Sequence, residues 1–232
     1  MPGPRRRKDR AAKRHAVPEG PRRDSAPPAP APAPASAKAP FWTTFAFQAL
    51  AVAALAVALY ANTFGHGYAF DDGIVIRENA HVQQGFAGIG NILTRDAFDS
   101  YFRAMRVDAN QLPAGRYRPL SIVTFAVEQQ LFGDNAPLRH AVNVLLYAAT
   151  AVLLLWLLRA HLLRDSAWAL LATILFVVHP VHTEVVANIK GRDEILSFLF
   201  FVLTLAFALR YDEKRRLSDL LLGLCAYFLA LL

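Results

Sequence analysis

The sequence predicts an all-α integral membrane protein, and three observations predict this class. First, 55% of the 232 residues are hydrophobic, which is more than a soluble domain of this size usually carries. Second, the apolar residues gather in runs close to the length of about 20 residues that a helix needs to cross a bilayer. Third, most basic residues lie near the start of the chain or in short gaps between these runs, as is typical of membrane proteins. We therefore expect a bundle of about four or five transmembrane helices with an outer-face loop that contains interfacial helices.

The net charge of +7 does not indicate a nucleic-acid-binding protein. The basic side chains are not placed to form one face of a folded domain, so we expect the lipid bilayer as a partner and no nucleic acid. The single cysteine, Cys225, lies inside an apolar run. No disulfide can form within the chain, and the redox environment cannot be inferred from it.

Residues 1–40 differ from the rest of the chain. They contain a basic block, RRRKDRAAKRH, and a Pro/Ala tract, PPAPAPAPASAKAP, and neither can bury a hydrophobic core. We predict a disordered cytoplasmic tail in front of an uncleaved membrane anchor. A cleaved signal peptide is the alternative, but the charged leader is longer than usual and no clear cleavage site follows the apolar run.

The apolar runs predict the spans in chain order. They are 41–61, 137–158, 167–188, 192–211 and the start of a fifth at 217–232. Because the last run is interrupted by the end of the chain, we expect the protein to continue beyond Leu232. The stretch 119–133 is short and contains Glu128, so we expect it to be an amphipathic helix at the membrane interface rather than a span.

The loop charges predict the orientation of the spans. Basic residues favour the cytoplasmic side, and they occur in the tail, in the loop with Arg159 and Arg164, and in the loop with Arg215 and Arg216. This places the N-terminus in the cytoplasm and the loop 62–136 outside it. The Ala-rich composition favours a bacterial inner membrane over the endoplasmic reticulum.

This topology gathers many ionisable residues at the outer ends of the predicted spans. Polar groups at membrane depth are expensive unless they are paired, which makes them candidates for function. The candidates are Asp71, Asp72, Arg116, Arg118, His179, His182, Glu184, Lys190, Arg192, Asp193 and Glu194.

Asp71 and Asp72 stand in the apolar stretch YAFDDGIVI. They could simply end the first span and begin a solvated loop. Their apolar neighbours favour instead a buried or interfacial turn. Adjacent carboxylates repel each other there, so that one could serve as a general base or both could face a cation.

The motif HPVHTE carries His179, His182 and Glu184. Together these side chains resemble a metal-ligand set. However, Pro180 interrupts the helix, and two histidines with one carboxylate are weak evidence without a third strong ligand. We therefore predict no metal site. The alternative to a metal-binding role is that the motif begins a new short helix at Pro180.

The cations and carboxylates near residue 190 also have two interpretations. Asp193 and Glu194 could stabilise the N-terminus of the following helix. Lys190 and Arg192 could be interfacial side chains whose charged ends reach water. A cluster of outward-facing cations would equally bind the phosphate of a lipid headgroup.

The motifs FDD, YRPL and HPVHTE…GRDE together resemble a known family. Over about residues 60–211 they are similar to the N-terminal part of the transmembrane and tetratricopeptide-repeat O-mannosyltransferases and their bacterial relatives. These are glycosyltransferases of the GT-C fold that use polyprenyl-phosphate sugars. The resemblance implies a partial GT-C-like bundle here, with tetratricopeptide repeats expected farther along the chain.

The resemblance also implies roles for the candidate residues. A mannose-like hexose would pass from a polyprenyl-phosphate donor to a hydroxyl of an extracytoplasmic protein, with Asp71 or Asp72 as the general base. The donor phosphate and the substrates would be bound by Arg116, Arg118, His179, His182, Glu184, Lys190, Arg192, Asp193 and Glu194. No cofactor is predicted, and the need for a divalent cation stays open.

Two other functions remain open from the sequence. The chain could be a non-catalytic membrane anchor or scaffold of a larger repeat protein. It could also be a small transporter or metal-site protein built on His179, His182 and Glu184. The sugar, the acceptor, the oligomeric state, the activity of this chain alone and the identity of the base are not determined by the sequence.

Overall fold

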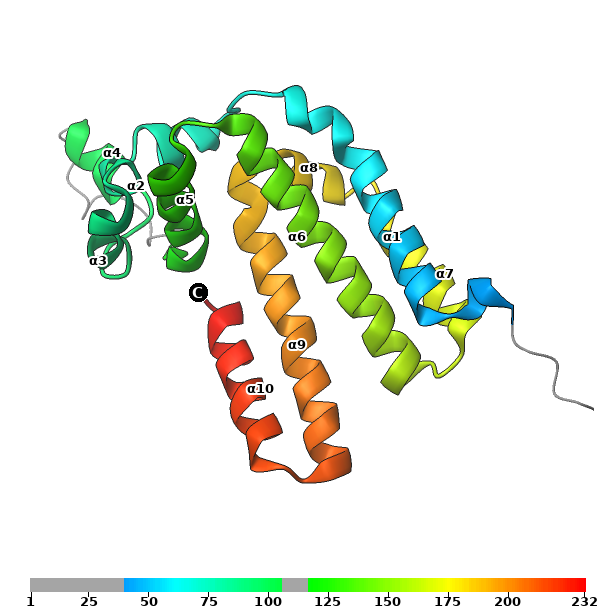
Figure 1. Cartoon of the computed structure of the whole chain (residues 1–232). Coiled ribbons are helices and arrows are strands. Elements are labelled where there is room, and N and C mark those ends of the chain that lie inside the picture. The colour runs from blue at the N-terminus through cyan, green and yellow to red at the C-terminus, as the bar shows by residue number, and fades with distance from the viewer. Residues whose placement is uncertain (1–39, 106–116) are drawn as a thin grey trace, which may run out of the picture. The chain divides into compact units, whose positions relative to one another are not determined.

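The computed structural model describes residues 40–105 and 117–232, and within these ranges all regular elements are helices (Figure 1). Three of them are long and apolar enough to cross a membrane, namely Phe45–Gly65, Ala136–Leu162 and Ile189–Lys214. Two shorter helices, Ser166–Val177 and Leu217–Ala230, are also apolar. The all-α membrane class is therefore confirmed, and the chain is a multi-pass membrane protein. Residues 1–39 of the predicted tail lie outside the described residues.

Helices α1 (Phe45–Tyr60) and α6 (Ala136–Leu157) pack against each other (Figure 1). Side-chain caps begin both helices: the Thr44 hydroxyl accepts a hydrogen bond from the N–H of Phe47, and the Asn135 amide oxygen accepts one from the N–H of Leu138. Such caps satisfy N–H groups that have no partner within the helix. Small and branched side chains such as those of Val52 and Ala56 lie in the buried core of this bundle, so the two helices can approach closely.

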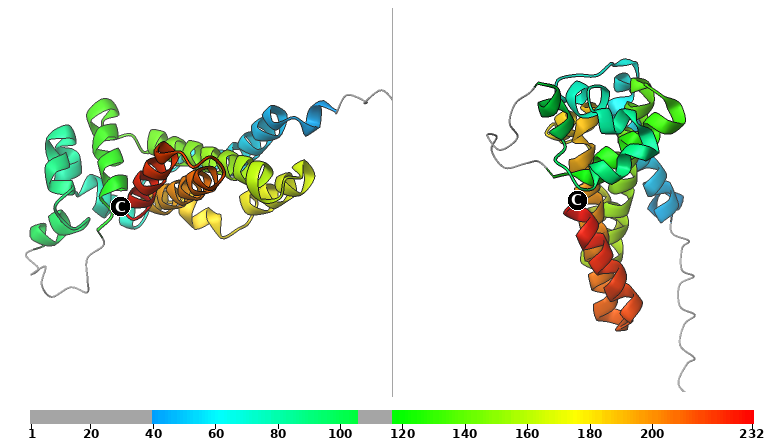
Figure 2. Two further views of the ribbon diagram at one scale, coloured as in Figure 1. Left: turned by 90° about the horizontal axis from the view of Figure 1, so that it is seen from below. Right: turned by 90° about the vertical axis from the view of Figure 1, so that its left-hand side faces the viewer.

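Helices α9 (Arg192–Lys214) and α10 (Leu217–Ala230) form an antiparallel hairpin (Figure 2). The turn between them contains Arg215 in a left-handed conformation with φ of 52°. A Cβ added at Gly223 would lie 3.4 Å from the Phe207 Cβ, so the two helices are in close contact at that point. The Arg210 guanidinium lies 3.2 Å from the buried Asp219 carboxylate, which joins the helices near the turn.

The predicted span 167–188 is divided in two. Helix α7 (Ser166–Val177) ends before Pro180, and a separate short helix, α8 (His182–Ala187), follows it. Proline has no N–H to donate and its ring collides with the preceding turn, which explains the break. The Tyr147 hydroxyl of α6 donates to the free carbonyl of Val177 at 3.1 Å.

A short helix, η7 (Ile189–Gly191), connects α8 to α9. A Cβ at Gly191 would lie 2.3 Å from the Val185 carbonyl oxygen. The absence of a side chain therefore allows the connection to fold tightly against α8, which brings Lys190 close to the end of the bundle that carries the candidate residues.

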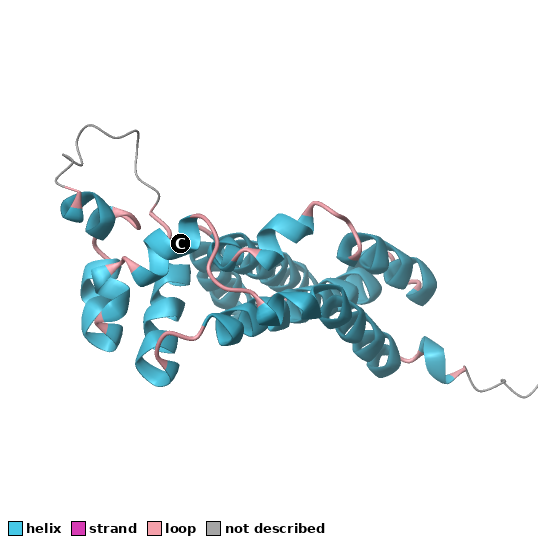
Figure 3. Ribbon diagram, turned by 90° about the horizontal axis from the view of Figure 1, so that it is seen from above, coloured by secondary structure: helices cyan, strands magenta, loops and turns pink. Residues whose placement is uncertain are grey.

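The predicted outer loop folds as a group of short helices (Figure 3). They are η3 (Gly73–Arg77), α2 (Ala80–Gln83), η4 (Gly85–Gly88), α3 (Ile89–Ile92), α4 (Asp99–Ala104) and α5 (Pro119–Phe132). Their own small core contains Val75, Ile76 and Phe125. Helix α5 occupies the stretch in which we expected an interfacial helix, and it turns Glu128 inward, where that side chain is nearly buried. The group is thus connected to the long helices through α5, which contacts α9.

Candidate functional site

Asp72 holds a tight turn at residues 69–72. Its Oδ2 accepts a hydrogen bond from the N–H of Ala69 at 3.1 Å, and its own N–H donates to the Ala69 carbonyl at 3.0 Å. Its Oδ1 accepts from the N–H of Lys190 at 2.7 Å, across 118 positions of sequence. The side chain is fully buried. Burial raises the pKa of the Asp72 carboxyl above its ordinary value, although the N–H groups of Lys190 and Ala69 oppose this shift.

Asp71 has a different environment from its neighbour. Its side chain is 43% exposed, and its Oδ2 lies 3.8 Å from the Nζ of Lys190. It lines an open pocket of about 660 Å³ that we call the first pocket. The other lining residues are His66, Ala69, Phe70, Thr183, Glu184, Ala187 and Asn188. Of the two aspartates, Asp71 is therefore the one that a substrate could reach.

A second pocket, of about 290 Å³, contains two of the predicted cations, Arg118 and Lys190. Arg118, Lys190, Asp193 and Glu194 line it together with apolar side chains that include Phe125. An Nη of Arg118 lies 4.0 Å from a carboxylate oxygen of Glu194. Because Lys190 lines this pocket and also contacts Asp71, it connects the second pocket to the first.

The structure places Arg192 in the interior instead of in either pocket. Its guanidinium is completely buried. It donates to Glu128 at 2.5 Å and to Thr124 at 2.9 Å on α5, and to Asn143 at 2.7 Å on α6. Its charge also lies over the ring of Phe125, 4.4 Å from the ring centre. With these partners Arg192 joins α5, α6 and α9 and supports Phe125 of the second pocket.

Glu128, Arg139 and Asn143 belong to the same buried network, and the sequence analysis did not select them. The Arg139 guanidinium lies 3.6 Å from Glu128 and also donates to the Tyr68 hydroxyl and to Gln129. Charged and amide side chains inside apolar runs are costly without partners. This signal was present in the sequence PLRHAVN and could have identified Arg139 and Asn143.

The HPVHTE motif surrounds the break between α7 and α8. His179 is exposed, and its Nδ1 accepts a hydrogen bond from the N–H of Val181 at 3.2 Å. The His182 ring packs against Phe176, with ring centres 4.4 Å apart, while Glu184 lines the first pocket. Within residues 40–105 and 117–232, no three His, Cys, Asp or Glu side chains are grouped to hold a metal ion.

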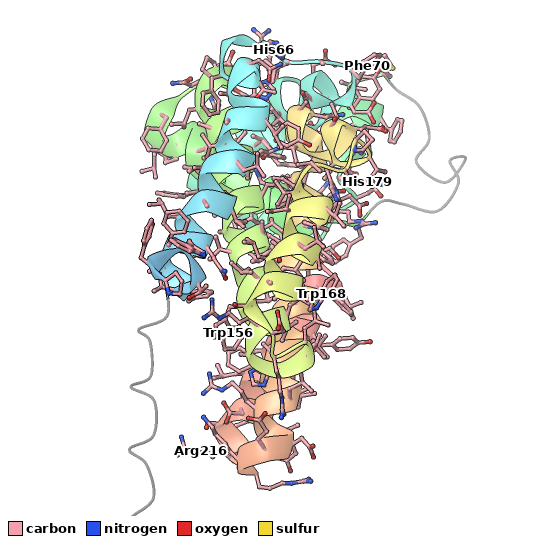
Figure 4. All side chains as sticks on the ribbon, turned by 90° about the vertical axis from the view of Figure 1, so that its right-hand side faces the viewer. His66, Phe70, Trp156, Trp168, His179 and Arg216 are labelled. Carbon is pink, nitrogen blue, oxygen red and sulfur yellow. The ribbon has the colours of Figure 1, made fainter. Side chains whose placement is uncertain are left out.

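Figure 4 shows His66, Phe70 and His179 toward one end of the bundle, and Arg216 at the opposite end. Most of the candidates thus divide into residues of the first pocket, residues of the second pocket and buried supports, whereas His179 and His182 line neither pocket. Arg116 lies outside the described residues. The arrangement can do two things chemically: a carboxylate can take a proton in the first pocket, and the adjacent cations can stabilise an anion in the second.

Sequence comparison finds relatives that are named protein O-mannosyl-transferases. The chain is 32% identical over 183 residues to the protein O-mannosyl-transferase TMTC2 of Mus musculus, which covers 76% of this chain and 21% of that protein. It is 32% identical over 180 residues to the protein O-mannosyl-transferase TMTC4 of Homo sapiens, covering 71% and 22%. It is 34% identical over 181 residues to the protein O-mannosyl-transferase Tmtc1 of Drosophila melanogaster, covering 78% and 20%.

The matched region is a limited part of these proteins. The chain spans about a fifth of the length of the curated relatives it matches. No family model matches the chain, and no solved structure matches it.

Proposed function

Since the chain is a relative of the TMTC-type protein O-mannosyl-transferases, we propose that it carries part of the active site of a membrane glycosyltransferase. The observation that supports this most is the Asp71 carboxylate of the first pocket, which lies 3.8 Å from the Lys190 ammonium of the second pocket. Sugar transfer requires a base at the acceptor and a positive charge at the leaving group. This pair supplies both groups within one short distance.

In the proposed reaction, Asp71 takes the proton of an acceptor hydroxyl in the first pocket. The hydroxyl oxygen forms a bond to the anomeric carbon of the sugar, and the bond from that carbon to the donor phosphate oxygen breaks. The electron pair of the broken bond stays on the phosphate. Lys190, with Arg118 at the far side of the second pocket, stabilises this added negative charge.

We propose a polyprenyl phosphate as the carrier of the sugar. The sequence contains no nucleotide-binding loop, and the second pocket combines the cations Arg118 and Lys190 with the apolar side chains of Ile122 and Phe125. A phosphate joined to a hydrocarbon chain matches this combination. The names of the relatives support mannose as the sugar and a protein hydroxyl as the acceptor.

The proposed orientation places both pockets on the extracytoplasmic side. It follows from the basic loops and from the position of Arg216 at the end opposite to His66 and Phe70 (Figure 4). We propose a bacterial inner membrane as the location, on the basis of the Ala-rich composition. The acceptor protein would then approach from the outer side.

Substitution of Lys190 tests this proposal. We expect Lys190→Ala in the full-length protein to lower kcat/KM for transfer from polyprenyl-phosphate mannose by about 100-fold, the usual effect of removing one group that stabilises a developing anion. The backbone N–H of residue 190, which binds Asp72, is retained, so the fold should not change. Transfer is measured with radiolabelled donor in vesicles.

The matched control is Lys214→Ala, because Lys214 is exposed at the other end of α9. This variant should transfer at the wild-type rate, and Lys190→Arg should keep part of the activity. Wild-type transfer by Lys190→Ala would contradict the role of Lys190. Equally efficient transfer from a water-soluble nucleotide sugar would contradict the lipid-linked donor.

A further inference from the structure

Phe70 has an unusual conformation at the edge of the first pocket. Its side chain is 94% exposed, and its φ of 44° lies in the left-handed region. For a bulky residue this region is rarely occupied, and the conformation is unfavourable. The chain therefore holds a large apolar ring away from its core in a backbone conformation that is unfavourable by itself.

The bonds of Asp72 explain how this conformation is maintained. The N–H and the carboxylate of Asp72 both bind Ala69, and the carboxylate also binds the backbone of Lys190. The two residues between, Phe70 and Asp71, are thereby directed outward. Strained residues that the surrounding structure holds in place are concentrated at functional sites, so the orientation of Phe70 calls for a ligand.

We propose that Phe70 is a specificity-determining residue that packs against an apolar side chain next to the acceptor hydroxyl. This inference rests on the proposed function, in which the hydroxyl is deprotonated by the adjacent Asp71. Phe70 lines the first pocket but not the second, so it stands on the acceptor side of Asp71 and away from the proposed phosphate position.

The lining of the first pocket is consistent with an acceptor polypeptide. Thr183 and Asn188 offer side chains that can hydrogen-bond a peptide backbone. Phe70 supplies the large apolar surface, and aromatic rings of this kind often contribute most to binding. Asp71 and Glu184 make the pocket unfavourable for an acidic flanking residue. A membrane contact is less consistent, because polar side chains line the pocket beside Phe70.

The test uses the full-length protein in vesicles and two fluorescent peptides that carry one threonine flanked by either leucine or glycine. Peptide binding is measured by anisotropy, and transfer is measured separately. We expect the wild type to bind the leucine peptide more tightly, and Phe70→Ala to weaken that binding about tenfold with little change for the glycine peptide. Phe70→Tyr should keep the preference, as should Phe86→Ala, which removes another exposed phenylalanine.

The measurements of binding and of transfer distinguish the specificity role of Phe70 from the proposed transferase function. Loss of the leucine preference in Phe70→Ala supports the inference, whether or not transfer occurs under the same conditions. An unchanged preference overturns it, as does an equal loss of binding for both peptides, which would indicate a membrane or folding role. If the wild type binds but does not transfer mannose, the proposed function fails independently of the specificity.

Discussion

Asp71→Asn in the full-length protein should lower the rate of mannose transfer by at least about 100-fold, the usual contribution of a general base. The amide has almost the same size as the carboxylate but cannot take a proton from the acceptor. Because Asp71 is 43% exposed, the substitution should leave the thermal midpoint of unfolding nearly unchanged. The measurement is transfer per folded protein at saturating donor and acceptor.

Asp72→Asn is the internal control. We expect it to lower the stability of the protein, which Asp71→Asn should leave nearly unchanged. The side chain is fully buried and accepts hydrogen bonds from two backbone N–H groups, those of Ala69 and Lys190. One amide cannot present two oxygens, so one N–H would face an NH₂ group, and a lost buried hydrogen bond costs about 1–3 kcal/mol. We expect a lower thermal midpoint. Normal transfer by Asp71→Asn, together with inactive but fully stable Asp72→Asn, would reverse the two assignments.

Arg192→Leu should destabilise the protein by about 3 kcal/mol, because removal of the nearer partner leaves a buried charge with only the more distant Arg139, 3.6 Å away, to compensate it. The charge in question is that of Glu128, which lies 2.5 Å from Arg192. Asn143 and Thr124 would lose a hydrogen-bond donor as well. The measurement is the fraction of folded protein in detergent as a function of temperature.

Two further variants separate the buried charge from the loss of volume. Adding Glu128→Gln to Arg192→Leu should recover part of the stability, since the partly compensated carboxylate is removed and Arg139 keeps its ion pair with Asp134. Arg103→Leu removes an exposed arginine that also pairs with a carboxylate, that of Asp99, and should change stability by less than about 1 kcal/mol. Equal effects of Arg192→Leu and Arg103→Leu would contradict the supporting role of the network.

The helices could be predicted from the sequence because each long apolar run carries its own signal. The division of the third run was also indicated locally, by Pro180, whose effect on a helix depends on its own ring. The inward orientation of Glu128 could not be predicted in this way. It depends on Arg192 and Arg139, which reach it from two other helices.

Most residues of the candidate site could be predicted from the sequence, but the role of each residue could not. Sequence position alone makes Asp71 and Asp72 equivalent, and they differ because Asp72 is buried and accepts hydrogen bonds from the backbone N–H groups of Ala69 and Lys190. Arg192 looked like an available cation for the same reason. Its partners on α5 and α6 bury it, and such distant contacts leave no local pattern in the sequence.

We infer that Asp71 faces the substrate while Asp72 holds the turn behind it. The most direct test is the labelling rate of Asp71→Cys and Asp72→Cys with a membrane-impermeant maleimide, in full-length protein whose native cysteines, Cys225 included, are replaced by serine. We predict rapid labelling at position 71 from the outer side, protection there by acceptor peptide, and much slower labelling at position 72. Faster labelling at position 72, or labelling of position 71 from the cytoplasmic side, would contradict the account.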